Sequence, residues 1–151
     1  MYVEWRWEWT FEILPQMLWA TLNTFLAAGV GYAIAAIVGI LFMLGQRTPY
    51  KIINIIIREI VEFIRSTPLL VQLFFVYFVA PQFGLTLSAW VSAMITIGLH
   101  YGTYLSEVYR GALEGVPKTQ WEACRALNFS TSYNYRKIIL PQAFPIAIPG
   151  M

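Results

Sequence analysis

The sequence is short of charged residues. Asp, Glu, Lys and Arg make up 12% of its 151 residues, whereas about 25% is typical of soluble domains. The net charge of +2 is too small to indicate a nucleic acid as partner. Hydrophobic residues make up 58% of the chain. This composition predicts a single-domain integral membrane protein.

Several chemical motifs are also missing. One cysteine excludes an intramolecular disulfide and says little about the compartment. The sequence has no G-x-x-x-x-G-K-[ST] phosphate loop, no metal cluster, no catalytic cysteine–histidine pair and no Gly-x-Ser-x-Gly turn. The first residues, with WRWEWTFE among them, do not form a cleavable signal peptide. We therefore expect no enzyme, no bound metal and no cofactor.

Two long stretches without Asp, Glu, Lys or Arg predict the membrane helices. They cover residues 13–46 and 66–106, and about 20 apolar residues cross a bilayer. Pro81, Gln82 and Gly84 divide the second stretch into two spans. The predicted segments are an interfacial lead-in on the periplasmic side (1–12), a first membrane helix (17–44), an amphipathic segment leading into a second (52–80), a third (87–106), a polar loop (107–140) and the start of a fourth (141–151).

The N-terminal residues are rich in tryptophan. Trp5, Trp7 and Trp9 lie within the first 12 residues. Tryptophan is concentrated at membrane surfaces because its ring is apolar while its N–H needs a partner. We interpret the segment as an interfacial lead-in, and an aromatic ligand site is the less favoured alternative.

Small residues lie on or near one face of the first predicted helix, at Gly29, Gly31, Ala35 and Gly39. Small residues allow helix backbones to approach closely in lipid. The pattern predicts a packing seam rather than a ligand site.

The segment before the second membrane helix combines apolar residues with a charged face. Arg58, Glu62 and Arg65 are spaced to share that face and to pair. This is typical of an amphipathic helix at the inner membrane surface, or of one entering the membrane with its charges reaching back to water. Thr67 and Pro68 then predict a helix start, with Thr67 as the cap.

The single histidine, His100, lies near the middle of the third predicted membrane helix. An ionisable group at this depth is a functional candidate, although a neutral histidine bonded to a neighbouring helix is commoner. We name His100, Tyr101 and Thr103 as weak candidates for a substrate path. A membrane enzyme using His100, Tyr101 and Glu107 is the alternative, but Glu107 lies about 10 Å farther along the helix.

Basic residues predict the orientation. Four lie in 45–65 and five in 107–137, whereas the N-terminus holds only Arg6 and the turn at 81–86 holds none. Cytoplasmic loops collect Lys and Arg. We therefore expect the N-terminus outside, three crossings, and the 107–140 loop in the cytoplasm.

Within this loop, residues 115–142 predict a helix, a break and a second helix. Apolar residues give the first helix one face, at Trp121, Cys124, Leu127 and Phe129. Glu122 and Arg125 lie beside it and can pair. Asn128 falls where the first helix should end, because Asn readily adopts the left-handed conformation. The three residues that follow, 130–132, are candidate caps for the second helix.

This loop resembles the coupling loop of ABC-importer membrane subunits, whose pattern is Glu-Ala-Ala, three residues, Gly, nine residues, then Ile-x-Leu-Pro. Glu122-Ala123-Cys124 corresponds to its first part and Asn128 to its Gly. Ile138, Leu140 and Pro141 fall in register. Cys124 and Asn128 depart from the pattern, but both are small or helix-ending, so we expect the geometry to survive. An ordinary cytosolic loop is the alternative.

The likeness extends along the chain. Two further segments are similar to polar-amino-acid importer permeases, EFIRSTPLLVQLFFVYF (62–78) and GTYLSEVYRGALEGVPKTQWEACRAL (102–127). Within this family, the sequence most resembles the ectoine/hydroxyectoine permeases. The resemblance implies an all-α membrane protein, a type I ABC-importer transmembrane domain. Family members have about five membrane helices, and this chain supplies three complete transmembrane helices and the start of a fourth, so it looks truncated at its C-terminus. A non-transporting fragment or an assembly subunit is therefore the alternative.

The resemblance also implies a function. The chain would be a permease subunit, in the bacterial inner membrane, of an ATP-driven, binding-protein-dependent importer of polar amino acids or ectoine-type solutes. Its partners would be membrane lipid, a pair of cytosolic ATPase subunits that bind the ATP, a second permease subunit (the same or different) and a periplasmic or lipid-anchored binding protein. The residues that couple to the ATPase would be Trp121, Glu122, Ala123, Cys124, Leu127, Asn128, Ile138, Leu140 and Pro141.

Overall fold

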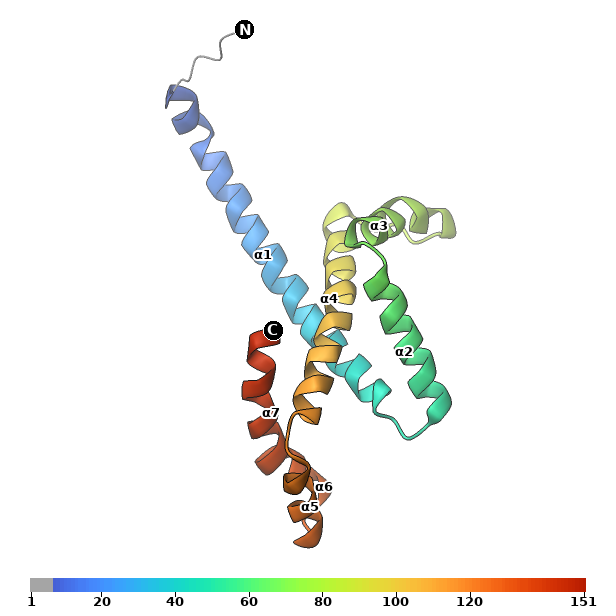
Figure 1. Cartoon of the computed structure of the whole chain (residues 1–151). Coiled ribbons are helices and arrows are strands. Elements are labelled where there is room, and N and C mark those ends of the chain that lie inside the picture. Colours follow the sequence, from blue (N-terminus) through green and yellow to red (C-terminus); the bar gives the residue numbers. More distant parts are fainter. Residues whose placement is uncertain (1–6) are drawn as a thin grey trace.

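The computed structural model describes residues 7–151, and these contain helices and no strand (Figure 1). The α-helices are α1 (Trp7–Gln46), α2 (Lys51–Ser66), α3 (Leu69–Phe74), α4 (Ala89–Glu114), α5 (Lys118–Ala126), α6 (Thr131–Tyr133) and α7 (Leu140–Ala147). Short π or 3-10 turns are η1 (Phe75–Val79), η2 (Ala80–Phe83), η3 (Asn134–Ile139) and η4 (Ile148–Gly150). The predicted all-α class is confirmed. Part of the lead-in, 1–6, lies outside the described residues, and the rest belongs to α1.

The crossing of α1 and α4 is the main contact of the fold (Figure 1). A Cβ added to Gly39 would lie 2.9 Å from Leu105 Cβ and 3.1 Å from the Gly102 carbonyl oxygen. A Cβ added to Gly102 would lie 2.8 Å from Val38 Cβ. Glycine at both positions therefore lets the two backbones meet. The predicted seam is confirmed for three of its four members, all buried, but Gly29 has open space around it.

The face of α4 that packs on α1 also carries hydroxyl groups. Thr96, Thr103 and Ser106 are at most 2% exposed. Each hydroxyl donates to a backbone carbonyl of its own helix at 2.6–2.7 Å. Because these donors are satisfied internally, the polar residues of α4 can be buried against a neighbouring helix.

A sharp break separates α2 from α3. The axes of α2 and of the stretch from Leu69 to Phe83 differ by 101°. Pro68, which lacks an N–H, is the cap of α3, and the Thr67 hydroxyl donates to the Phe63 carbonyl at 2.8 Å. The prediction that Thr67 caps α3 is wrong, since its side chain bonds to the end of α2. The segment 52–80 is accordingly a bent pair rather than one straight helix.

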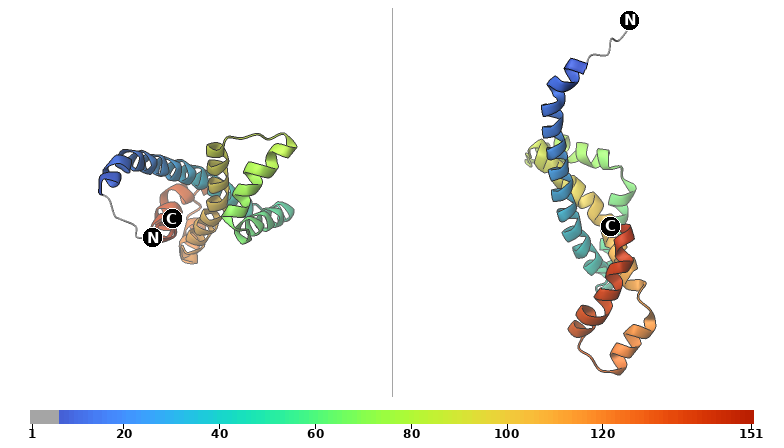
Figure 2. Two further views of the ribbon diagram at one scale, coloured as in Figure 1. Left: turned by 90° about the horizontal axis from the view of Figure 1, so that it is seen from above. Right: turned by 90° about the vertical axis from the view of Figure 1, so that its left-hand side faces the viewer.

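Length and apolar composition identify α1 as a candidate membrane span among the described residues, and α2 with α3 as a second if the bent pair is one span or a re-entrant loop. Apolar side chains of α1 are largely exposed, as expected of a surface that faces lipid. Its first half extends away from the other helices, and α2 and α3 lie on one side of α4 (Figure 2). The third crossing, 87–106, stays a prediction.

The turn between α1 and α2 lies at the same end of the bundle as α5 and α6, opposite the α3–α4 connection (Figure 1). This end carries Arg47 and Lys51 together with Lys118 and Arg125. Arg65 is one of the four basic residues within 45–65. It lies at the other end of α2, roughly 20 Å from Lys51 along the helix axis.

Candidate coupling site

The residue that ends α5 and the residue that caps α6 are those predicted from the sequence. Asn128 has φ of +52°, a left-handed conformation that ends α5. The Phe129 N–H donates to the Cys124 carbonyl at 3.2 Å, which satisfies a carbonyl at the helix end. The Ser130 hydroxyl accepts from the Tyr133 N–H at 3.4 Å and caps α6. The predictions for Asn128 and Ser130 are confirmed.

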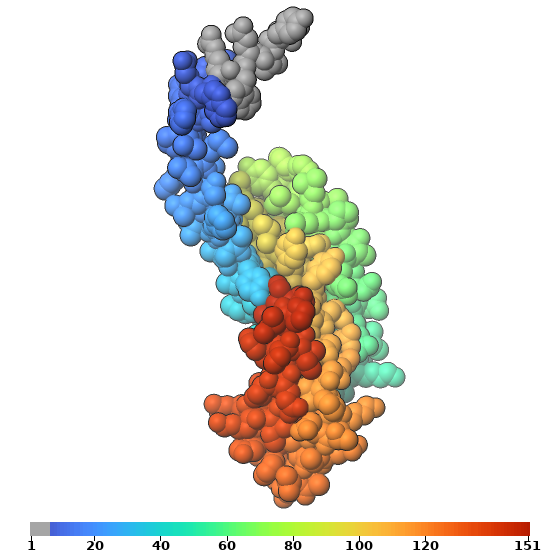
Figure 3. Space-filling view, turned by 60° about the vertical axis from the view of Figure 1, so that its left-hand side comes forward, coloured from blue at the N-terminus to red at the C-terminus, as the bar shows by residue number. Residues whose placement is uncertain are grey.

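The inner side of the site is an apolar cluster that joins α4, α5, η3 and α7. Ile139 is fully buried, and Cys124 is 2% exposed. The Trp121 ring meets the Tyr135 ring edge-on at 5.4 Å and packs against the cluster with Ile138. The buried members are Ala112, Leu113, Val116, Ile139, Ala143 and Ala147. Through Trp121 these contacts attach α5 to η3 and the cluster. The orange and red parts of the chain accordingly lie against each other at one end of the molecule (Figure 3).

The apolar face predicted for α5 divides in two. Trp121 packs against the cluster and Cys124 is buried, whereas Leu127 is 64% exposed and Phe129 is 40% exposed. The left-handed turn at Asn128 redirects the chain before Phe129, so Phe129 does not continue the face of Trp121 and Cys124. Leu127 and Phe129 therefore form an apolar surface that is available to a partner.

Polar residues flank this exposed surface. Glu122, Ala123 and Arg125 are exposed on α5. No ion pair joins Glu122 to Arg125, so that predicted pair does not form. Leu140 and Pro141 begin α7 and are also exposed. The Ile-x-Leu-Pro part of the importer loop pattern begins at Ile138, but Ile139 is the more deeply buried of the two residues.

A polar cluster ties α1, α2 and α4 together near this end. Gln46 Nε2 donates to Glu107 Oε1 at 2.9 Å, and the Asn54 amide donates to the Gln46 carbonyl. Arg110 bonds to Glu107 at 2.6 Å and to Glu114 at 2.9 Å. Gln46 was not predicted from the sequence, in which its only signal is an amide at the end of a long apolar helix.

Glu107 is held in its charged form by this cluster. Burial works to raise its pKa, but hydrogen bonds from Arg110 and Gln46 outweigh burial and leave the pKa of Glu107 below its usual value. A carboxyl with a lowered pKa in the folded state stabilises the fold above its unfolded pKa. This contribution disappears as pH falls through the folded pKa.

Replacing Glu107 tests this contribution. We expect Glu107→Gln to lower the free energy of unfolding at neutral pH by about 1.5–3 kcal/mol, the range for hydrogen bonds to charged groups. We also expect it to flatten the loss of stability in acid. Thermal unfolding in detergent between pH 3 and 7 measures both effects. Glu122→Gln is the control, because Glu122 is exposed and forms no ion pair within the described chain. Equal pH curves for the two variants would contradict the assignment.

The three substrate-path candidates lie in different surroundings. Tyr101 is half exposed and, with Tyr104, lines a cavity of about 700 Å³ between α1, α3 and α4. His100 is 8% exposed and its Nδ1 lies 3.1 Å from Gln72 Nε2. Thr103 is fully buried and donates to the His100 carbonyl. The structure therefore brings Tyr101 to a cavity, while Thr103 lies in the helix packing. Glu107 bonds to Gln46 and Arg110 instead of His100.

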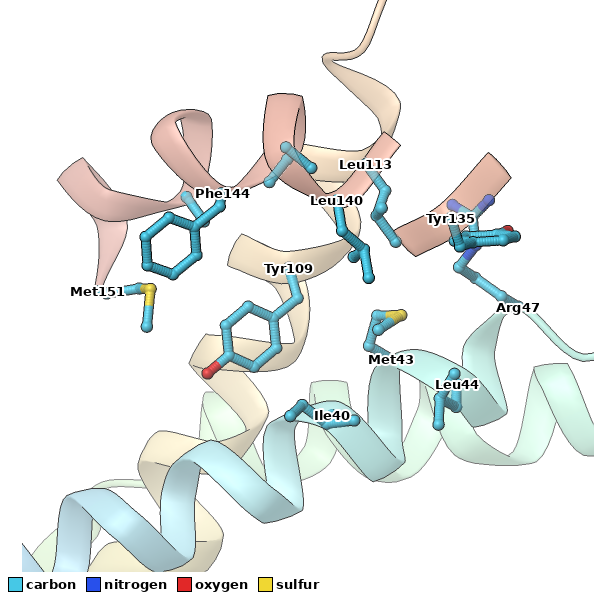
Figure 4. A pocket seen from close by; sticks show the side chains of 13 residues that line it. Ile40, Met43, Leu44, Arg47, Tyr109, Leu113, Tyr135, Leu140, Phe144 and Met151 are labelled. Carbon is cyan, nitrogen blue, oxygen red and sulfur yellow. The ribbon is translucent and has the colours of Figure 1, made fainter. Parts of the chain in front are cut away.

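A second cavity, of about 900 Å³, lies between α1, α4 and α7 (Figure 4). Ile40 and Met43 line it from α1, and Phe144 faces Tyr109 across it. Arg47 lies at one end, beside Tyr135, and is its one charged lining residue. The cavity adjoins the apolar cluster of the coupling site, with which it shares Ala112, Leu113, Ala143 and Ala147.

Known proteins resemble this chain over nearly its full length. A probable amino-acid ABC transporter permease protein, y4tG, of Sinorhizobium fredii (strain NBRC 101917 / NGR234) is 37% identical over 93% of this chain and 61% of its own. The L-cystine transport system permease protein TcyB of Bacillus subtilis (strain 168) is 31% identical over 93% and 62%. The chain thus spans about three fifths of the length of these relatives.

Solved structures agree with the sequence comparison. A crystal structure of an amino acid ABC transporter with histidines matches with a TM-score of 0.88 and 26% identity, over 99% of this chain and 69% of its own. An inward-facing MetNI methionine ABC transporter matches in fold with a TM-score of 0.62 and 23% identity, over 88% and 63%. The predicted type I ABC-importer transmembrane fold is confirmed.

The family model for "Binding-protein-dependent transport system inner membrane component" matches residues 31–151. This family consists of transport components, so the prediction that the chain is not an enzyme is confirmed. The match includes α4, residues 115–142 and the part of α1 from residue 31 onward, which carries Gly31, Ala35 and Gly39. The chain belongs to the family of binding-protein-dependent transport system inner membrane components.

Proposed function

We propose that the chain is a permease subunit of an ATP-driven, binding-protein-dependent importer of polar amino acids. Membership of the family supports a transport role, and the names of y4tG and TcyB support amino acids as substrates. Ectoine-type solutes share the carboxylate and cation of amino acids, but neither relative names them. The observation that carries the coupling role is the exposed Leu127 at the end of α5, a helix whose Trp121 packs against the apolar cluster.

The geometry supports a lever-like mechanism. Leu127 and Phe129 would enter an apolar groove of a cytosolic ATPase, and Glu122 would meet a basic group at its edge. A push on α5 would pass through Trp121 and Ile139 to α4 and α7, because the packed cluster leaves little room for independent movement. Closure of the ATPase pair on ATP would thereby change the arrangement of the membrane helices.

We place the coupling end in the cytoplasm of a bacterium, with the N-terminus outside the inner membrane. The basic turn 47–51 and the basic residues of α5 lie at the same end of the bundle (Figure 1), which fits the preference of Lys and Arg for cytoplasmic loops. The further partners would be a second permease subunit and a periplasmic or lipid-anchored binding protein.

The proposal is tested by Leu127→Asp. We expect the variant to retain at most a tenth of the ATPase subunit in co-purification, and to lose substrate uptake in parallel, because a charge would enter an apolar groove. Leu85→Asp is the matched control, since Leu85 is 62% exposed in the connection at the opposite end of the bundle. Equal retention of the ATPase by both variants would overturn the coupling role.

A further inference from the structure

The side chain of Gln72 connects the two halves of the bent helix pair. Its Nε2 lies 2.7 Å from the Ile64 carbonyl oxygen, in the last turn of α2, and 3.0 Å from the Thr67 carbonyl oxygen. Both carbonyls lie at the end of α2, and the Ile64 oxygen also accepts from the Thr67 N–H at 3.3 Å. Gln72, on α3, therefore bonds across the 101° break to the backbone at the end of α2.

The same nitrogen also contacts α4. His100 Nδ1 lies 3.1 Å from Gln72 Nε2. The two carbonyl oxygens show that the amide nitrogen, and not the amide oxygen, faces this point, because only the nitrogen can donate to them. Its two N–H groups are shared among three acceptors, the Ile64 oxygen, the Thr67 oxygen and His100 Nδ1. His100 Nδ1 must then accept, which requires the neutral ring with its proton on Nε2.

The other groups around His100 leave this arrangement sensitive to a proton. The rings of Tyr101 and Tyr104 lie 5.3 and 5.2 Å from the His100 ring, and Arg65 of α2 lies over the Tyr104 ring at 5.0 Å. From α1, the residues that meet this part of α4 at Gly98 and Gly102 are uncharged: Ile34, Ala35 and Val38. Gln72 is the polar contact from α3. No carboxylate of the described chain bonds to His100, so no negative charge bonded to the ring balances the positive charge of a protonated His100.

We propose that Gln72 and His100 form a proton-sensitive latch that fixes the bend between α2 and α3 beside the cavity lined by Tyr101 and Tyr104. Gln72 is the positioning residue, and neutral His100 is its acceptor on α4. Protonation of His100 places an N–H opposite the amide donor. Turning the amide to accept from that N–H would keep the contact with His100 but remove the amide donors from Ile64 and Thr67, so in either case the bend loses part of this three-way connection.

The role of the latch in transport rests on the function proposed above, but the latch can be measured without transport. Spin labels at Ile56→Cys on α2 and Phe83→Cys at the end of η2 report the bend, since both positions are exposed. The native cysteine is removed by Cys124→Ala, which restores the alanine of the loop pattern. The full chain in lipid nanodiscs is measured at pH 8 and pH 5, with helicity checked by circular dichroism.

We expect a narrow distance distribution at pH 8 that becomes at least twofold broader at pH 5. His100→Asn keeps a side-chain acceptor that does not titrate, so its distribution should stay narrow at both values. His100→Leu and Gln72→Met should be broad at both. A narrow distribution for Gln72→Met, or the same response to pH in His100→Asn as in the wild type, would overturn the latch. Failure of the proposed function would appear instead as a chain that neither binds an ATPase nor supports uptake.

Discussion

Gly39→Leu is expected to abolish the packing of α1 on α4. The added side chain meets Leu105 Cβ at 2.9 Å and two backbone atoms, the Gly102 oxygen at 3.1 Å and the Ser106 nitrogen at 3.2 Å. Backbone atoms of a helix cannot turn aside as a flexible side chain can. Overpacking usually costs about 1–3 kcal/mol, and we expect this case to reach about 3 kcal/mol or more. Thermal unfolding in detergent and the yield of folded chain measure the loss.

Gly29→Leu is the matched control for this prediction. Gly29 lies on the same helix, and an added Cβ there meets nothing within 4 Å. The control should unfold like the wild type, within about 0.5 kcal/mol. If both variants were equally stable, the close approach of α1 and α4 at Gly39 would be wrong.

Ile139→Ala is expected to loosen the coupling site. Ile139 is fully buried in the cluster that joins α4, α5 and α7. Removing three carbons from such a site costs about 2–5 kcal/mol, because the lost contacts leave a cavity. We expect the free energy of unfolding to fall by this amount. Protection of α5 amides against hydrogen exchange should fall with it, which mass spectrometry measures.

The control for this substitution is Ile148→Ala, since Ile148 is 56% exposed. The same three carbons are removed there, so the two variants differ mainly in burial. Exchange at α5 should remain as in the wild type. Faster exchange at α5 in Ile148→Ala, or unchanged exchange in Ile139→Ala, would show that the cluster does not hold the coupling helix.

Features set by local chemistry could be predicted from the sequence. Asn128 ends α5 and Ser130 begins α6, because each depends on a backbone conformation or a bond to a residue three positions away. The seam of Gly31 and Gly39 was also predicted, since residues four or eight apart share a helix face. Gly29 was wrongly included, because the sequence does not show where the partner helix crosses.

Other features depended on neighbours that are distant in the sequence. Periodicity placed Trp121 and Leu127 on one face, but only Trp121 meets Tyr135 and the apolar cluster. The π-helical turn η3 changes the helical phase before α7, and Ile139 rather than Ile138 is fully buried.

Composition and spacing alone predicted a membrane protein, and a helix, a left-handed break and a second helix within residues 115–142. Apolar length and helix-ending residues are properties of short segments, so they can be read without a partner. The tertiary structure decided which side chains face a partner and how Gln46 and Gln72 join separate helices. An amide becomes a connector only when the fold brings an acceptor within hydrogen-bond distance, and spacing along one helix does not contain that information.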